Sequence, residues 1–179
     1  MPRQFWVAAV PPFHIADGTA YNTSITLTDV SPTPPITLPG YTLLEPGYEL
    51  ELEASGQFSN TGTPTLLLGF YYGGVAGVAL AASSAVPTTT GAAAWPWRMR
   101  YRGVVRVVGS AGQIVGQGEL MLGTALTLFT VRPIPEVAAS RTVTIDTTVA
   151  KTLTVGAQWG TSNALNTLTC NDISAKLVN

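Results

Sequence analysis

Apolar and polar residues alternate with a period of two along most of this chain, which is the pattern of β-strands that bury one face. Residues 47–58, "GYELELEASGQF", show it clearly, because three glutamates alternate with apolar residues: Glu49, Glu51 and Glu53 against Leu50, Leu52 and Ala54. No stretch repeats apolar residues at the spacing of an amphipathic helix. The pattern therefore predicts an all-β protein.

Further strands are expected at intervals along the rest of the chain. The expected ranges are 65–74, 113–122, 124–131, 141–148, 151–159 and 166–178, with an extended segment in 75–86 and further candidates at 21–28 and 5–10. Turns rich in Gly, Pro, Asn and Ser separate them, "RPIPE" (132–136) is expected to be a loop, and the proline-rich residues 29–40 predict an irregular connection. About eight to ten strands in a chain of this length predict a jelly-roll-like antiparallel β-sandwich.

The 179 residues suffice for one domain with its own core. We expect a single sandwich domain over residues 20–179, preceded at residues 1–19 by an N-terminal arm or a first strand. The aromatic residues Phe5, Trp6 and Phe13 suit an arm that docks on a neighbouring subunit or a shell, because exposed aromatic residues are common at interfaces. The alternative is that this segment is simply the first strand of the sandwich.

Residues 94–109, "AWPWRMRYRGVVRVVG", contain four of the seven arginines beside three aromatic residues. Arginines interleaved with rings are typical of single-strand nucleic-acid binding. Read as one strand, however, the stretch separates into a core face and an arginine face: Trp95, Trp97, Met99, Tyr101, Gly103, Val105 and Val107 against Arg98, Arg100, Arg102 and Arg106. Rings and guanidinium groups on opposite faces cannot share a base, and the net charge is −1, so we expect no nucleic-acid partner.

The glutamate row of residues 49–53 has the same spacing as the arginine row. We expect the two rows to face each other, either on neighbouring strands or across a subunit interface. Directly opposed unlike charges contribute about 0.2–1 kcal/mol per pair. The alternative is two separate solvated faces.

Composition narrows the chemistry. Only 11% of the residues are charged, against about 25% in an average domain, which suits a protein that lives in an assembly. With one cysteine, Cys170, and one histidine, His14, the chain can form no internal disulfide, and neither a zinc site nor a Ser-His-Asp triad is expected. No apolar run reaches about 18 residues, so we expect no membrane span. We predict no enzyme activity, no catalytic or metal-binding residues and no cofactor.

The C-terminal third, residues 144–179, carries a resemblance. Its "D-T-T-x-A-x-x-L-x-V-x-A-x-W" segment and the "A-x-N-T-L-T" strand after it resemble the ending of a group of tailed-phage virion proteins; the matching residues are Asp146, Thr147, Thr148, Ala150, Leu153, Val155, Ala157, Trp159, Ala164, Asn166, Thr167, Leu168 and Thr169. The turn at residues 16–20 and "SNTGTPTL" at 59–66 are similar to the same group. The proline-rich segment and the arginine-rich strand depart from its pattern.

The resemblance implies a jelly-roll homotrimer on the virion. Its expected role is that of a capsid decoration (cement) protein, which binds the major capsid protein on the outer capsid surface and stabilises the shell. The alternative is a receptor- or carbohydrate-binding module of a tail fibre or baseplate. Exposed tryptophans would favour that alternative, with Trp95 or Trp97 stacking on sugars if the two faces of their strand are inverted.

Overall fold

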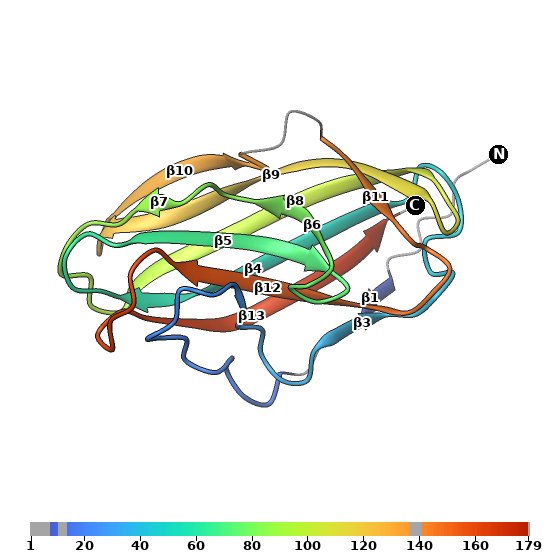
Figure 1. Ribbon diagram of the computed structural model, residues 1–179. Helices are drawn as coiled ribbons and strands as arrows, with labels where there is room; N and C mark the ends of the chain where they lie inside the picture. The colour runs from blue at the N-terminus through green and yellow to red at the C-terminus, as the bar shows by residue number, and fades with distance from the viewer. Residues whose placement is uncertain (1–7, 11–13, 137–140, 179) are drawn as a thin grey trace.

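The computed structural model describes residues 8–10, 14–136 and 141–178, and these form two antiparallel sheets packed against each other as a β-sandwich (Figure 1). The described residues contain strands, turns and irregular segments but no helix. The all-β class and the sandwich architecture expected from the alternating pattern are thus confirmed.

The larger sheet has seven strands in the order β1-β13-β4-β8-β9-β10, and β11 also pairs with β9. Their bounds are β1 Ala8–Val10, β4 Glu49–Ser59, β8 Trp95–Val107, β9 Gly112–Ala125, β10 Leu128–Ile134, β11 Thr142–Ile145 and β13 Thr167–Val178. The six-stranded smaller sheet has the order β2-β12-β5-β6, with β3 also beside β12 and β7 beside β5. Its strands are β2 Thr28–Asp29, β3 Ile36–Leu38, β5 Thr65–Tyr72, β6 Val78–Ala82, β7 Val86–Pro87 and β12 Lys151–Trp159.

Strands from the two ends of the chain are neighbours in both sheets. β4 lies beside β13, and β5 beside β12, so the C-terminal strands close the sandwich that the N-terminal half begins. Nine of the thirteen described strands have four residues or more, which accounts for the eight to ten strands expected. Of the other four, β1 lies within the candidate at 5–10, whereas β2, β3 and β7 have only two or three residues, too few for an alternating pattern. The segment 29–40 is therefore not irregular throughout, because it contains β3.

Three expected boundaries were wrong. Residues 124–131 are not one strand, because Leu126 and Thr127 form the turn of the β9–β10 hairpin. The "RPIPE" segment is not all loop, since β10 continues to Ile134, and Pro133 is accommodated on an edge strand. Of residues 21–28 only Thr28 lies in a strand, because local hydrogen bonds such as Tyr21 Oη to Thr26 O, at 2.6 Å, replace sheet pairing there.

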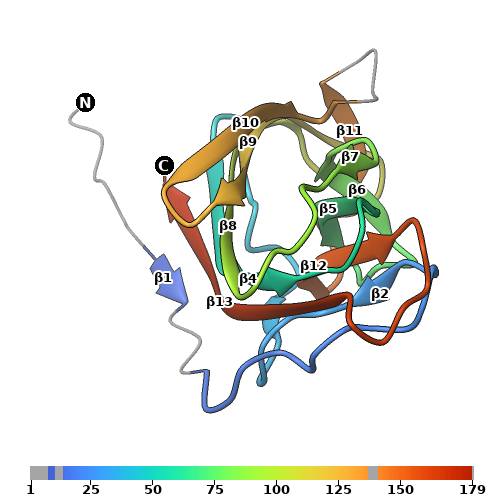
Figure 2. The same ribbon diagram turned by 90° about the vertical axis from the view of Figure 1, so that its left-hand side faces the viewer.

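The core lies between the sheets and is almost entirely apolar. The inner face of β12 contributes Trp159, that of β5 Phe70, that of β4 Phe58 and that of β8 Trp97, all at most 1% exposed. Trp97 and Trp159 are the largest fully buried side chains among the described residues. Figure 2 shows the two sheets curving around this core.

The buried Tyr101 ring fills a space that two glycines leave open on the inner face of the larger sheet. Gly103 of β8 and Gly116 of β9 lie opposite each other, and the Tyr101 ring covers both. A Cβ atom on Gly116 would lie 2.4 Å from Tyr101 Cζ, and one on Gly103 would lie 2.4 Å from Tyr101 Oη. Burial raises the pKa of the Tyr101 hydroxyl, which has no hydrogen-bond partner in the described part of the chain.

A polar clamp joins the two sheets near the end of β10. The Glu136 carboxylate accepts hydrogen bonds from Ser84 N (2.9 Å), Ser84 Oγ (2.8 Å) and Arg132 Nη1 (2.6 Å). The Glu136 amide donates to Ala82 O of β6 at 3.0 Å. Burial raises the pKa of the Glu136 carboxyl, but these hydrogen bonds and the Arg132 charge outweigh it, so the pKa is lowered overall.

Candidate interaction surfaces

The glutamate and arginine rows lie on neighbouring strands of one chain. β4 pairs with β8 so that Glu51 is directly opposite Arg102 and Glu53 directly opposite Arg100. Both rows project from the outer face of the larger sheet, because the residues that alternate with them along β4 and β8 are buried in the core. Of the two arrangements expected from the sequence, the structure therefore shows pairing between adjacent strands.

The lower half of this ladder centres on Arg102. Arg102 Nε donates to Glu49 Oε2 at 2.9 Å, a second guanidinium nitrogen contacts the same oxygen, and Glu51 Oε1 lies 3.9 Å from Arg102 Nε. The hydrogen bond and the charge of Glu49 raise the pKa of Arg102. Because Arg102 is exposed, this pairing orders the surface more than it stabilises the fold.

The upper half centres on Glu53, which forms ion pairs with two arginines of β8. Arg98 contacts Glu53 Oε1, and Arg100 Nε lies 3.6 Å from the same atom. Glu119 of β9 stands directly across from Arg100 on its other side. The glutamate column of β4 therefore lies beside the arginine column of β8, and Glu119, the one charged residue of β9, lies on the other side of Arg100.

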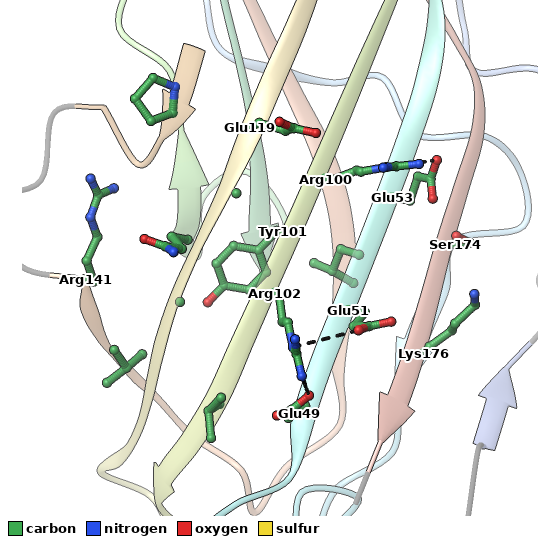
Figure 3. Close-up of a pocket in the computed structure, with 17 residues that line it drawn as sticks. Glu49, Glu51, Glu53, Arg100, Tyr101, Arg102, Glu119, Arg141, Ser174 and Lys176 are labelled. Atoms are coloured by element: carbon green, nitrogen blue, oxygen red, sulfur yellow. Dashed lines mark hydrogen bonds and ion pairs between the residues drawn. The ribbon is translucent and has the colours of Figure 1, made fainter. Parts of the chain in front are cut away.

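These columns line a shallow trough of about 1050 Å³ on the outer face of the larger sheet (Figure 3). Lys176 of β13 borders it on one side and Arg141 on the other. Arg141 donates to Pro135 O, so its guanidinium is held at the rim. Four acidic and four basic side chains line the trough, so the net charge of its lining is zero and favours neither a polyanion nor a polycation.

The last arginine of the row departs from the ladder. A β-bulge between Val105 and Val107 leaves Arg106 without a register partner on β9. The bulge also changes the facing of the next residue, so Val107 is 44% exposed instead of lying on the core face as expected. The expected division of faces holds from residue 95 to residue 105 and fails after the bulge.

The tryptophans of β8 are not presented for stacking. Trp97 is 1% exposed, and Trp95 is partly buried with its ring edge-on to Phe58 at 6.4 Å between centroids. The alternative in which these tryptophans face outward and stack on sugars is therefore wrong.

The expected docking residues Phe5, Trp6 and Phe13 lie outside the described residues. The described part of the N-terminal segment is tied to β13. Ala8–Val10 pairs with β13 as an edge strand, and His14 Nε2 is 2.8 Å from Ile173 O.

A second surface, missed by the sequence reasoning, lies at one end of the sandwich, on the right in Figure 1. Three loops meet there, formed by residues 39–48, 108–111 and 146–150. Together with Val107 at the end of β8, they expose five apolar side chains: Tyr41 (64%), Leu44 (56%), Val107 (44%), Val108 (37%) and Val149 (43%). We call this set the apolar end. It escaped notice because its members come from separate segments and share no periodic pattern.

Thr147 fastens the three loops together. Its carbonyl accepts from Tyr41 N at 2.8 Å, its amide donates to Gly109 O at 3.0 Å, and its hydroxyl accepts from Gly109 N at 2.9 Å. Tyr41 is held at φ +61°, a left-handed conformation that is uncommon for a bulky residue. The apolar end is therefore a fixed surface, and its aromatic ring is presented at the expense of backbone strain.

A third surface follows the edge strand β10. Leu126, Leu128, Phe129 and Val131 are 44–71% exposed, and β10 pairs on only one side among the described residues. The sequence carried a signal here, because "LTLFTV" (126–131) has apolar residues on both faces of a strand, whereas a half-buried strand needs only one.

Comparisons with known proteins do not assign any of these surfaces, since no family model, no curated protein sequence and no solved structure matches this chain. Among the described residues, no three His, Cys, Asp or Glu side chains gather closely enough to hold a metal ion. That part of the chain also has no helix long and apolar enough to span a membrane.

Proposed function

We propose that the protein is a structural component of a phage virion: a homotrimeric decoration protein that binds the major capsid protein on the outer surface of the capsid and has no enzymatic role. The resemblance of residues 144–179 to tailed-phage virion proteins suggests the setting. The observation that carries the proposal is the apolar end.

The apolar end has the properties of a docking surface. Five apolar side chains, four from the three loops and Val107 from the end of β8, are exposed at this end, and exposed apolar groups that gather in one region mark interaction sites on proteins. Because Thr147 bonds the loops to each other, little conformational freedom remains to be lost on binding.

The mechanism is mechanical. Each subunit buries its apolar end against capsid subunits, and a trimer presents three such ends at once. Simultaneous engagement raises the avidity far above that of one contact. Expansion of the shell or pressure from inside then has to break these additional contacts.

A matched pair of substitutions tests the docking role. Asn tolerates the left-handed conformation, so Tyr41→Asn removes the ring and keeps the backbone. Leu165→Asn is the control, since Leu165 is 66% exposed against 64% for Tyr41 but lies in the β12–β13 loop at the opposite end (Figure 1). Co-sedimentation with undecorated capsids should show at least tenfold weaker binding for Tyr41→Asn and a change below twofold for Leu165→Asn. Equal binding by both variants would refute the docking role.

Two further measurements address the assembly. Light scattering should give three times the chain mass of 18.7 kDa, and a monomer would exclude the trimer. Electron microscopy of the virion should show a trimeric knob on the capsid. Density only at the tail would favour the tail-fibre or baseplate module, in which the same apolar end would face a receptor.

A further inference from the structure

The edge strand β10 presents an unusual combination of free backbone and apolar side chains. Phe129 and Val131 lie on the outer face of the larger sheet, and they are 44% and 55% exposed. Figure 2 shows β10 as the last strand on its side of the larger sheet. An unpaired, apolar edge of this kind is a template for another strand.

The usual protections of an edge strand are displaced from the centre of β10. A register irregularity occurs between Leu128 and Phe129, and Pro133 lies near the other end. Arg132 Nη1 donates to Glu136 Oε1 at 2.6 Å, so the Arg132 charge is paired within the chain and does not guard the open edge of β10. The segment from Phe129 to Val131 therefore lacks the bulge, proline or free charge that normally prevents strand addition.

Pro133 also indicates which backbone groups are available. Proline is tolerated on an edge strand when its nitrogen faces away from the neighbouring strand. Since backbone groups alternate in direction along a strand, Val131 and Phe129 then also direct their N–H and C=O groups away from β9. These are the residues that can form hydrogen bonds with an added strand.

We propose that β10 pairs with β10 of a second copy of this chain, antiparallel about a two-fold axis at Thr130, so that the larger sheets of two subunits join into one. The strand is self-complementary in this register. Phe129 lies opposite Val131 of the other copy, and Val131 lies opposite its Phe129. An aromatic side chain against a β-branched one is a favourable cross-strand pair.

The register also accommodates the ends of the strand. Pro133 falls opposite Thr127, beyond the pairs that form hydrogen bonds, so its missing N–H costs nothing. A two-fold contact is isologous, so it closes at two copies and leaves no unpaired β10 through which a fibre could grow. It is also compatible with a trimer, because two trimers can meet at such an axis.

The contact is small. With side chains of roughly 150–250 Å² each, the exposed parts of Leu126, Leu128, Phe129 and Val131 amount to roughly 400 Å² per subunit. A standard interface buries about 800 Å² per partner, so we expect this pairing to be weak and to need a high local concentration of the protein. Copies held side by side on a surface would reach such local concentrations.

Cysteine crosslinking tests the axis directly. In the proposed register Thr130 is opposite itself in a non-hydrogen-bonded pair, where Cα atoms are about 4.5 Å apart, within the range of a disulfide. Thr130→Cys should therefore give a covalent dimer under mild oxidation. Thr127→Cys is the control, since it is exposed and only three residues away, yet lies roughly 20 Å from its own copy. No crosslink at residue 130, or equal crosslinking at residue 127, would overturn the proposal.

Sedimentation provides a second readout. Val131→Lys places a charge at the paired segment and, because Val131 is 55% exposed, should leave the fold intact. It should weaken self-association at least tenfold, while the control Ile25→Lys, at a residue 56% exposed outside this edge, should change it less than twofold. Unchanged association of Val131→Lys would overturn the proposal. No capsid is present in either assay, so the outcome is independent of the proposed decoration function.

Discussion

Gly116→Ala is the most informative single substitution in the sandwich, because it places one methyl group where a buried ring already stands. The new Cβ would lie 2.3 Å from Tyr101 Oη, 2.4 Å from Cζ and 2.6 Å from Cε2. Ordinary contacts between carbon atoms are about 3.5–4.0 Å. The ring would have to withdraw by more than an ångström, although it also covers Gly103, where an added Cβ would lie 2.4 Å from Tyr101 Oη.

The expected loss of stability follows from this crowding. Inserting a methyl group into a packed core costs about 1–3 kcal/mol, and three ring atoms in collision place this site at the upper end. Replacing glycine also restricts the unfolded chain, which offsets about 0.4–1 kcal/mol. The net loss should be about 2 kcal/mol, or a melting temperature lower by about 4–8 °C for a domain of this size.

Urea and thermal unfolding of five proteins would measure this effect: the native chain, Gly116→Ala, Gln117→Ala, Tyr101→Leu and the double variant Tyr101→Leu with Gly116→Ala. Gly116→Ala and the control Gln117→Ala, an exposed neighbour on the outer face of β9, should differ by about 2 kcal/mol. In a Tyr101→Leu background, which lacks the colliding ring atoms, the same glycine substitution should cost less than about 0.5 kcal/mol. An equal cost in both backgrounds, or none in the native one, would refute the assignment of this space to Tyr101.

Two further predictions concern charged groups. The folded-state pKa of Glu136 is below its usual 4.5, so its interactions with Ser84 and Arg132 stabilise the fold above that pH and are lost as the pH falls through the folded-state value. Glu136→Gln should therefore unfold about 1 kcal/mol more easily at pH 7, with the difference shrinking below pH 4.5 in urea titrations, and a pH-independent difference would contradict the clamp. For the glutamate and arginine rows, a double-mutant cycle on Glu53 and Arg98 should give a coupling free energy of about 0.2–1 kcal/mol. The coupling should decrease in 1 M salt, because both side chains are about 40% exposed. Zero coupling at low salt would show that this contact does not contribute to stability.

Much of the fold could be read from the sequence, because strand periodicity is a local property. The alternation in residues 49–54 and 95–105 assigned the two faces of these parts of β4 and β8 correctly. The prediction failed at the β-bulge, where one extra residue turns Val107 from the core face to the outside. It also failed for strands too short to show a period, such as β2 and β7.

The candidate surfaces were only partly accessible from the sequence. The matching spacing of the glutamates and arginines predicted that the two rows meet, but it left open whether they meet within one chain. Pairing between β4 and β8, strands more than thirty residues apart in the chain, decided this. The apolar end was invisible, because Tyr41, Val108 and Val149 become neighbours only when their loops close over Thr147.

The sequence by itself determined that the chain is all-β, which faces of its long strands are apolar, and that its charges are few and arranged in complementary rows. The physical reason is that side-chain direction alternates with each residue of a strand, so composition and spacing suffice. Only the tertiary structure decided which strands are neighbours, where a bulge reverses a face, and which apolar residues remain exposed. Those outcomes depend on contacts between segments that are distant in the chain. The apolar residues at the apolar end and along β10 are exposed because the fold does not place them in the core.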